Sequence, residues 1–143
     1  MNSFIHAAHI LSAGAWMGGL VFTTVVVTPA FMRMEWTPQQ RIATRSAVGR
    51  QYSKIARINL AILLLAALLD RASQGGSTQS LLEITFIVLA IVLAELHAQI
   101  FAPRLGKASR SGDEVARKHA LRISISISML NLLLSFVIAT MAI

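Results

Sequence analysis

Residues 81–101 read LLEITFIVLAIVLAELHAQIF, and this run is long and apolar enough to cross a membrane, which indicates the fold class. A helix needs roughly 20 mostly apolar residues to span about 30 Å of hydrocarbon. Residues 4–31, 50–69 and 121–143 are similar in character. Every backbone donor in hydrocarbon must be paired, so four crossings predict four helices. We therefore expect an all-α polytopic membrane protein, an up-down four-helix transmembrane bundle forming a single domain over residues 1–143.

The composition agrees with a membrane protein and excludes several other classes. Only 13% of the residues are charged and 55% are hydrophobic, whereas soluble domains carry about a quarter charged residues. The net charge of +7 flanks apolar spans and forms no stripe with interleaved aromatic residues, so we expect no nucleic-acid partner. Anionic lipid head groups are the expected partner of these charges. The chain has no Cys, which excludes disulfides and thiolate metal sites.

The distribution of the basic residues predicts the orientation. Twelve of the 13 Lys and Arg residues fall within residues 33–57 and 104–122. Because cationic loops are retained in the cytoplasm, we expect residues 33–50 and 104–119 to form cytoplasmic loops and both termini to face outward. Within the first loop, Thr37 and Gln40 have the spacing of a capping box, which predicts a short interfacial helix.

Two patterns within the spans bear on helix packing. Gly14 and Gly18 form a small-xxx-small pair, which predicts close approach of another helix or of a flat cofactor. Ser124, Ser126 and Ser128 alternate with isoleucines, as in a strand. A lone strand cannot pair its backbone in lipid, so we expect a helix whose serines bond to carbonyls or to neighbouring helices.

Ionisable side chains within the spans are functional candidates because their burial in lipid is costly. In the predicted threading, His9 lies near the outer surface and His97 toward the cytoplasm, roughly 15 Å deeper at the helical rise. These two histidines therefore cannot share one metal ion. The candidate set comprises four histidines and three carboxylates: His6, His9, His97, His119, Asp70, Glu83 and Glu95.

The methionines extend these histidines into layers. Imidazole and thioether ligands suit copper, and thioether favours the cuprous state. The predicted metal ligands are His6, His9 and Met141 in an outer layer, Met17 and Met129 in a middle layer, and His97 and His119 in an inner layer. Methionines also fill gaps in apolar helices, so packing is the competing interpretation.

The carboxylates do not predict an acid/base site. Glu95 precedes His97 by two residues and points to another helix face, so its partner is expected to be Arg57, Asn59 or a serine of the fourth span. Glu83 is expected close to the outer surface, where ionisation costs little. No hydrolase triad, phosphate loop or metalloprotease motif occurs, so the sequence does not support soluble-enzyme chemistry and leaves the catalytic residues unknown.

Several short motifs resemble the CopD (copper-resistance D) family of membrane proteins. They are HILSAGAWMGGL at residues 9–20, TPAF at 28–31, GRQYSKIA at 49–56, LHAQIFAPRL at 96–105 and NLLL at 131–134. The resemblance covers nearly the whole chain. It implies copper handling in the bacterial inner (cytoplasmic) membrane, with His9 and His97 matching recurring histidines of that family as cofactor-binding residues.

The opening His9 to Trp16 also resembles the HemJ-type protoporphyrinogen oxidases, which are small four-helix proteins that bind haem b. This chain has Glu83 where that family carries Lys, and Ala30 where it carries His. These departures argue against tetrapyrrole oxidation, while haem binding stays open. A haem would need two axial ligands at one depth, such as His9 with Met141 or His97 with His119.

The sequence is therefore compatible with three hypotheses. The first is a CopD-like protein that binds or translocates copper, which we favour because that resemblance is broadest. The second is a b-type haem protein that transfers electrons or oxidises a tetrapyrrole. The third is a non-catalytic accessory subunit, present as a homo-oligomer or within a larger membrane complex, whose small-residue face packs on a partner.

Overall fold

The computed structural model describes residues 3–73 and 76–141, and these form four long helices joined by short connections. All four are long and apolar enough to cross a membrane, and the described residues contain no strand, so the predicted fold class is confirmed. Two of the four change to π-helix for about one turn. The elements are α1 (Ser3–Val21), η1 (Phe22–Val27), α2 (Thr28–Arg33), α3 (Pro38–Ser73), α4 (Thr78–Leu96), η2 (His97–Phe101), α5 (Ala102–Ser111) and α6 (Glu114–Met141).

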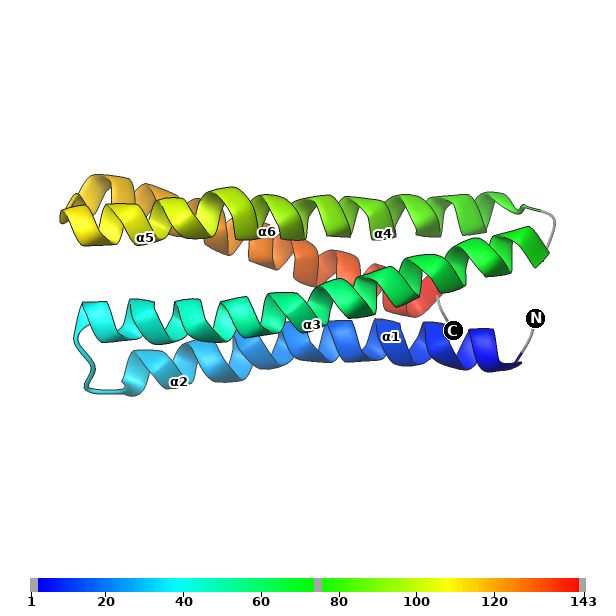
Figure 1. Cartoon of the computed structure of the whole chain (residues 1–143), viewed down its shortest axis with the longest axis horizontal. Coiled ribbons are helices and arrows are strands. Elements are labelled where there is room, and N and C mark those ends of the chain that lie inside the picture. The colour runs from blue at the N-terminus through cyan, green and yellow to red at the C-terminus, as the bar shows by residue number, and fades with distance from the viewer. Residues whose placement is uncertain (1–2, 74–75, 142–143) are drawn as a thin grey trace.

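The helices alternate in direction, as Figure 1 shows. The helices α1 and α4 run the same way, and α3 and α6 run back. Both α1 and α4 pack on α3 and on α6, so α1 and α4 lie on a diagonal of the bundle. Side chains from these two helices can therefore meet only across the bundle centre. The expected parallel course of the first and third spans is confirmed.

Each long helix contributes one large, fully buried side chain to the core. These are Trp16, Leu63, Ile87 and Ile138, none more than 2% exposed. Many other large apolar side chains point outward, among them Leu11, Leu65 and Leu133. A soluble protein rarely exposes apolar patches of this extent, whereas lipid tails are as apolar as leucine. The outer surface is therefore a lipid-facing one.

The segments predicted as cytoplasmic loops are mostly helical, so those boundaries were wrong. The helix α3 already begins at Pro38 instead of near Arg50, and α5 and α6 leave only a two-residue turn at 112–113. Charged residues are compatible with a helix that continues into water. In the first turns of α6, for example, Lys118 and Arg117 each form an ion pair with Glu114. A 34-residue helix is about 50 Å long, so the bundle exceeds the hydrocarbon thickness of about 30 Å.

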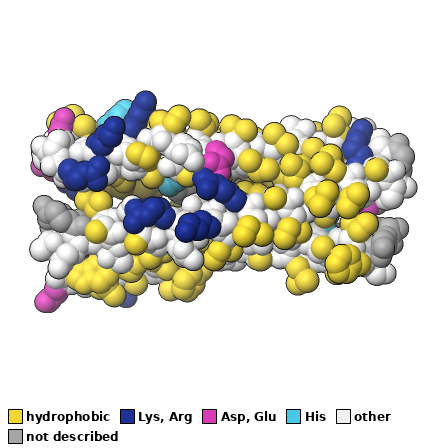
Figure 2. Space-filling model, in the orientation of Figure 1, with side chains coloured by type: hydrophobic (Ala, Val, Ile, Leu, Met, Phe, Trp, Pro, Cys, Tyr) yellow, Lys and Arg dark blue, Asp and Glu magenta, His cyan; other side chains and the backbone are white. Residues whose placement is uncertain are grey.

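The capping box predicted at Thr37 and Gln40 is confirmed. The Gln40 amide donates to Thr37 Oγ1 over 3.3 Å, and the Thr37 amide donates to Gln40 Oε1 over 2.9 Å. This box opens the 36-residue helix α3 and not the short interfacial helix that we expected. The cation-rich ends of α3, α5 and α6 consequently form a helical extension of the bundle, over which Lys and Arg gather in Figure 2.

Both π-helices precede a proline and lie at matching positions. The helices α1 and α4 each run for 19 residues before η1 and η2 begin. The Thr28 amide bonds to the Thr23 carbonyl, and the Ala102 amide bonds to the His97 carbonyl, five residues back in each case. Pro29 and Pro103 lack the amide hydrogen and clash with the preceding turn, so the helix widens there. In the second case the widened turn begins at His97.

The predicted role of Gly14 and Gly18 in helix packing was wrong within this chain. Both are exposed, and among the described atoms none lies within 4 Å of a Cβ built on either residue. The close approach occurs instead at Gly19, where a Cβ would lie 3.0 Å from the Tyr52 hydroxyl and closer still to its ring. That hydroxyl donates to the Trp16 carbonyl over 3.1 Å. The α1–α3 contact is therefore built on a neighbouring face of α1.

Candidate functional site

A buried imidazole and a buried carboxylate meet across the bundle centre. His9 Nε2 of α1 lies 2.8 Å from Glu83 Oε1 of α4, and the two side chains are 5% and 9% exposed. The contact lacks the angular geometry of a hydrogen bond, and neither atom has a hydrogen-bond partner elsewhere in the described part of the chain. Such a pair can share a proton or hold a cation, because both atoms offer lone pairs.

Helical periodicity places both residues on inward faces. His9 shares its face with the buried Ser12, Ala13 and Trp16, at spacings of three, four and seven residues. Glu83 is followed by the buried Ile87 and Ala90, which are four and seven residues further along. Both helices start at the same end of the bundle, so the two side chains also lie at the same depth.

Glu83 lies near one end of α4, as expected, but the prediction that it ionises there at little cost and without a visible partner was wrong. The prediction rested on the depth of Glu83 along its helix, and depth does not report the direction in which a side chain points. The informative signal was the apolar period of Ile87 and Ala90, which puts Glu83 on the core-facing side of α4. That period and the parallel course of the two helices put Glu83 on an inward face at the depth of His9, but the contact itself depends on how the helices pack.

The second histidine belongs to a separate, deeper contact. His97 Nε2 lies 2.8 Å from Ser124 Oγ of α6, and Ser124 is buried. At the helical rise, His97 lies about 20 Å beyond Glu83 along α4, so the two histidine tiers are distinct, as predicted. Of the serines in the fourth span, Ser124 bonds to a neighbouring helix and Ser128 donates to the Ser124 carbonyl of its own helix, so both modes expected for these serines occur. Arg45 lies within electrostatic range of His97.

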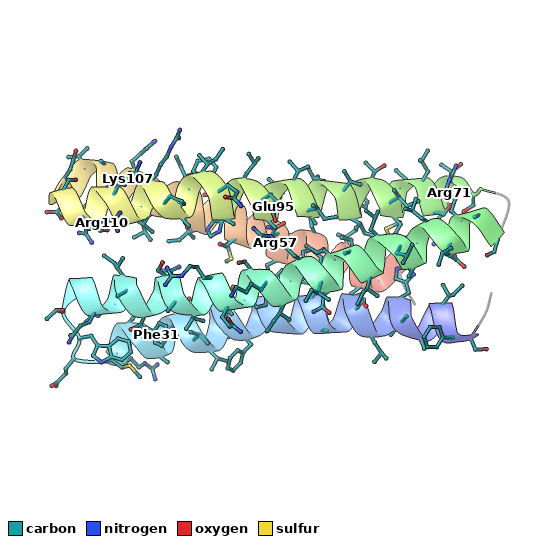
Figure 3. The ribbon with its side chains drawn as sticks, viewed as in Figure 1. Phe31, Arg57, Arg71, Glu95, Lys107 and Arg110 are labelled. Carbon is teal, nitrogen blue, oxygen red and sulfur yellow. The ribbon has the colours of Figure 1, made fainter. Side chains whose placement is uncertain are left out.

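Of the alternatives predicted as partners of Glu95, namely Arg57, Asn59 and a serine of the fourth span, the structure shows Arg57. Arg57 Nε and Nη2 donate to the two oxygens of Glu95 over 2.5 and 3.0 Å, and Figure 3 shows the two side chains meeting between α3 and α4. Gln99 donates to the same carboxylate over 3.4 Å. Since the two side chains are 48% and 39% exposed, this ion pair lies at the bundle surface, outside the core.

The remaining predicted ligands are spread over different faces. His6, Met17 and Met141 are partly buried, whereas Met129 and His119 are exposed. His119 precedes Ser124 by five residues and so lies on another face of α6, which does not bring it to His97. Among the described residues, no three His, Asp or Glu side chains are close enough to hold one ion. The complete three-layer ladder stays a prediction.

One family model matches the chain. It is described as a domain of unknown function, DUF4149, and it covers residues 11–114. No curated protein and no solved structure matches. The matched region contains Glu83, the Arg57–Glu95 pair and His97, whereas His9 and Ser124 lie just outside it.

Proposed function

The chain belongs to the DUF4149 family, and we propose that it is an integral membrane protein that binds a redox-active transition metal, copper by donor preference, at the buried His9–Glu83 pair. The observation that supports this proposal is the 2.8 Å separation of two buried donor atoms that have no hydrogen-bond partner in the described chain. Ionisable groups inside a membrane bundle are costly, so their retention indicates a function.

The geometry of the pair fits a metal ion. Nitrogen and oxygen ligands lie about 2.0–2.2 Å from a bound transition metal, so adjacent ligands at right angles are about 3 Å apart. The observed separation is of this size, and right-angled nitrogen and oxygen ligation is typical of Cu(II). Bivalent copper also binds most tightly among the first-row ions. The donor set thus suits copper without rearrangement of the two side chains.

His9 Nε2 and Glu83 Oε1 would hold the ion. His6 lies one turn from His9 on a neighbouring part of the same face and would supply a third donor after a side-chain movement. The buried Ser12, Ala13 and Trp16 keep bulk water away from His9. A bound copper ion would supply one-electron redox chemistry at this position.

The basic extension gives the orientation that we propose. Lys and Arg concentrated at one end of a bundle are retained in the cytoplasm, so in the proposed orientation both termini and the His9–Glu83 end would face the outer side of a bacterial inner membrane. The same cations would contact anionic head groups of the cytoplasmic leaflet. The metal would then be bound in the outer half of the membrane, facing the cell envelope.

Haem is less well supported than copper. Trp16, Leu63 and Ile87 are fully buried in the core, and a haem between the helices would have to displace these large side chains. His97 and His119 are not arranged as a pair of axial haem ligands, because His119 lies on a face of α6 that does not bring it to His97.

An accessory or oligomeric role is favoured by one observation. Gly14 and Gly18 are exposed, and small residues allow close helix contacts in membranes.

Metal analysis of the purified full-length protein tests the proposal. We expect bound copper after exposure to Cu(II) and dialysis, and loss of that copper in His9→Ala and in Glu83→Gln. His119→Ala is the matched control, because it removes an exposed imidazole. Equal copper binding by all four proteins would refute the assignment. A Soret band in the visible spectrum, dependent on His9, would favour haem instead.

A further inference from the structure

The bundle-facing side of α6 carries a line of polar side chains. Ser124, Asn131 and Ser135 are buried, and Ser128 is partly buried. Their spacings of four, three and four residues keep them on one helical face. We call these four residues the α6 seam. Most buried residues of the other helices are apolar, so the seam is a polar strip within an otherwise apolar core.

The seam has hydrogen-bonding capacity that the described chain does not use. Asn131 is only 6% exposed, and its Oδ1 has no partner among the described atoms. Ser128 and Ser135 donate to carbonyls of their own helix, those of Ser124 and Leu132, so their oxygens can still accept. An unsatisfied amide in an apolar interior is costly, and buried water is its usual partner in proteins.

The seam connects the two histidine tiers. Ser124 is bonded to His97 at the cytoplasmic tier. At the helical rise, Ser135 lies about 16 Å further along α6, which is within about one turn of the depth of Glu83. The titratable or charged groups at the ends of the seam are His9 and Glu83 on one side and His97 and Arg45 on the other.

We propose that the α6 seam holds a file of water molecules and that the bundle conducts protons between the His9–Glu83 pair and His97. A proton binds at the outer pair, an equal charge moves along the file by exchange of hydrogen bonds, and a proton leaves at His97. No electrons are transferred and no covalent bond other than O–H and N–H bonds changes. Chains of acidic and imidazole groups inside membranes serve as proton relays. The inference uses the same outer pair as the proposed metal site but requires no metal.

Proton flux into vesicles tests the inference. The full-length chain is reconstituted in phosphatidylethanolamine and phosphatidylglycerol vesicles that contain a pH-sensitive dye. A potassium gradient with valinomycin then drives protons inward. We expect flux above that of protein-free vesicles for the natural chain, and loss of that excess in Asn131→Leu. Ser126→Leu is the matched control, because Ser126 lies on the exposed side of the same helix.

A second variant tests the inference independently, in case Asn131→Leu does not fold. The double variant Ser124→Ala/Ser128→Ala removes only hydroxyls and should lower the flux in the same way. Natural protein that conducts no better than empty vesicles, or an Asn131→Leu protein that is folded and fully conducting, would overturn the inference. Copper retention by Asn131→Leu is measured in parallel. Proton flux without copper binding would refute only the proposed metal site. Copper binding without proton flux would refute only proton conduction along the α6 seam.

Discussion

Removing one member of the His9–Glu83 pair should destabilise the bundle far more than removing both. Neither atom of the pair has a hydrogen-bond partner in the described chain, and both side chains are at least nine-tenths buried. Glu83→Leu leaves a buried imidazole whose Nε2 has no hydrogen-bond partner, and His9→Leu leaves a buried carboxylate whose Oε1 has none in the described chain. Breaking a buried ion pair in this way costs about 3–5 kcal/mol, whereas replacing both partners by apolar residues is often neutral or stabilising.

The double variant His9→Leu/Glu83→Leu is therefore expected to be more stable than either single variant by about 3 kcal/mol or more. The free energy of unfolding is measured by titrating micelles of the purified protein with a denaturing detergent. Fluorescence of Trp16, which is 2% exposed in the folded bundle, reports the loss of the core. The exposed Glu114–Lys118 pair serves as control and should show far weaker coupling.

The reasoning would be refuted if the two single losses simply added in the double variant. Additivity would mean that the two side chains do not interact in the membrane-embedded protein, whatever their separation. It would also remove the basis for a metal site shared by the two residues.

Further predictions concern packing and orientation. Gly19→Ala forces the Tyr52 ring away and breaks its hydrogen bond to Trp16, so it should be less stable than Gly14→Ala by about 1–3 kcal/mol, since the helix-propensity gain is common to both. The same unfolding titration measures this difference, and equal stabilities would contradict the α1–α3 contact. A tag at either terminus should be cleaved by protease added to intact spheroplasts, and protection of both tags would reverse the proposed orientation.

The fold class followed from the sequence because the length and apolar content of a membrane span are local properties. The capping box at Thr37 and Gln40 was predictable for the same reason. The helix ends were not, because charged segments such as 104–119 fit equally well in a loop or in a helix that extends into water. Neighbouring helices, through packing of α5 on α6, decide between these two states.

The order of residues along the chain was enough to predict four helices that alternate in direction, with His9 and His97 in different tiers. For Glu95 it left several possible partners, of which Arg57 is the one observed. The contact of His9 with Glu83 across a diagonal of the bundle and the bond of His97 to Ser124 depend on how the four helices pack. Position along a chain gives the depth of a side chain. The rotation of each helix about its axis, which decides whether a polar group faces lipid or a partner, is fixed only when all four helices pack together.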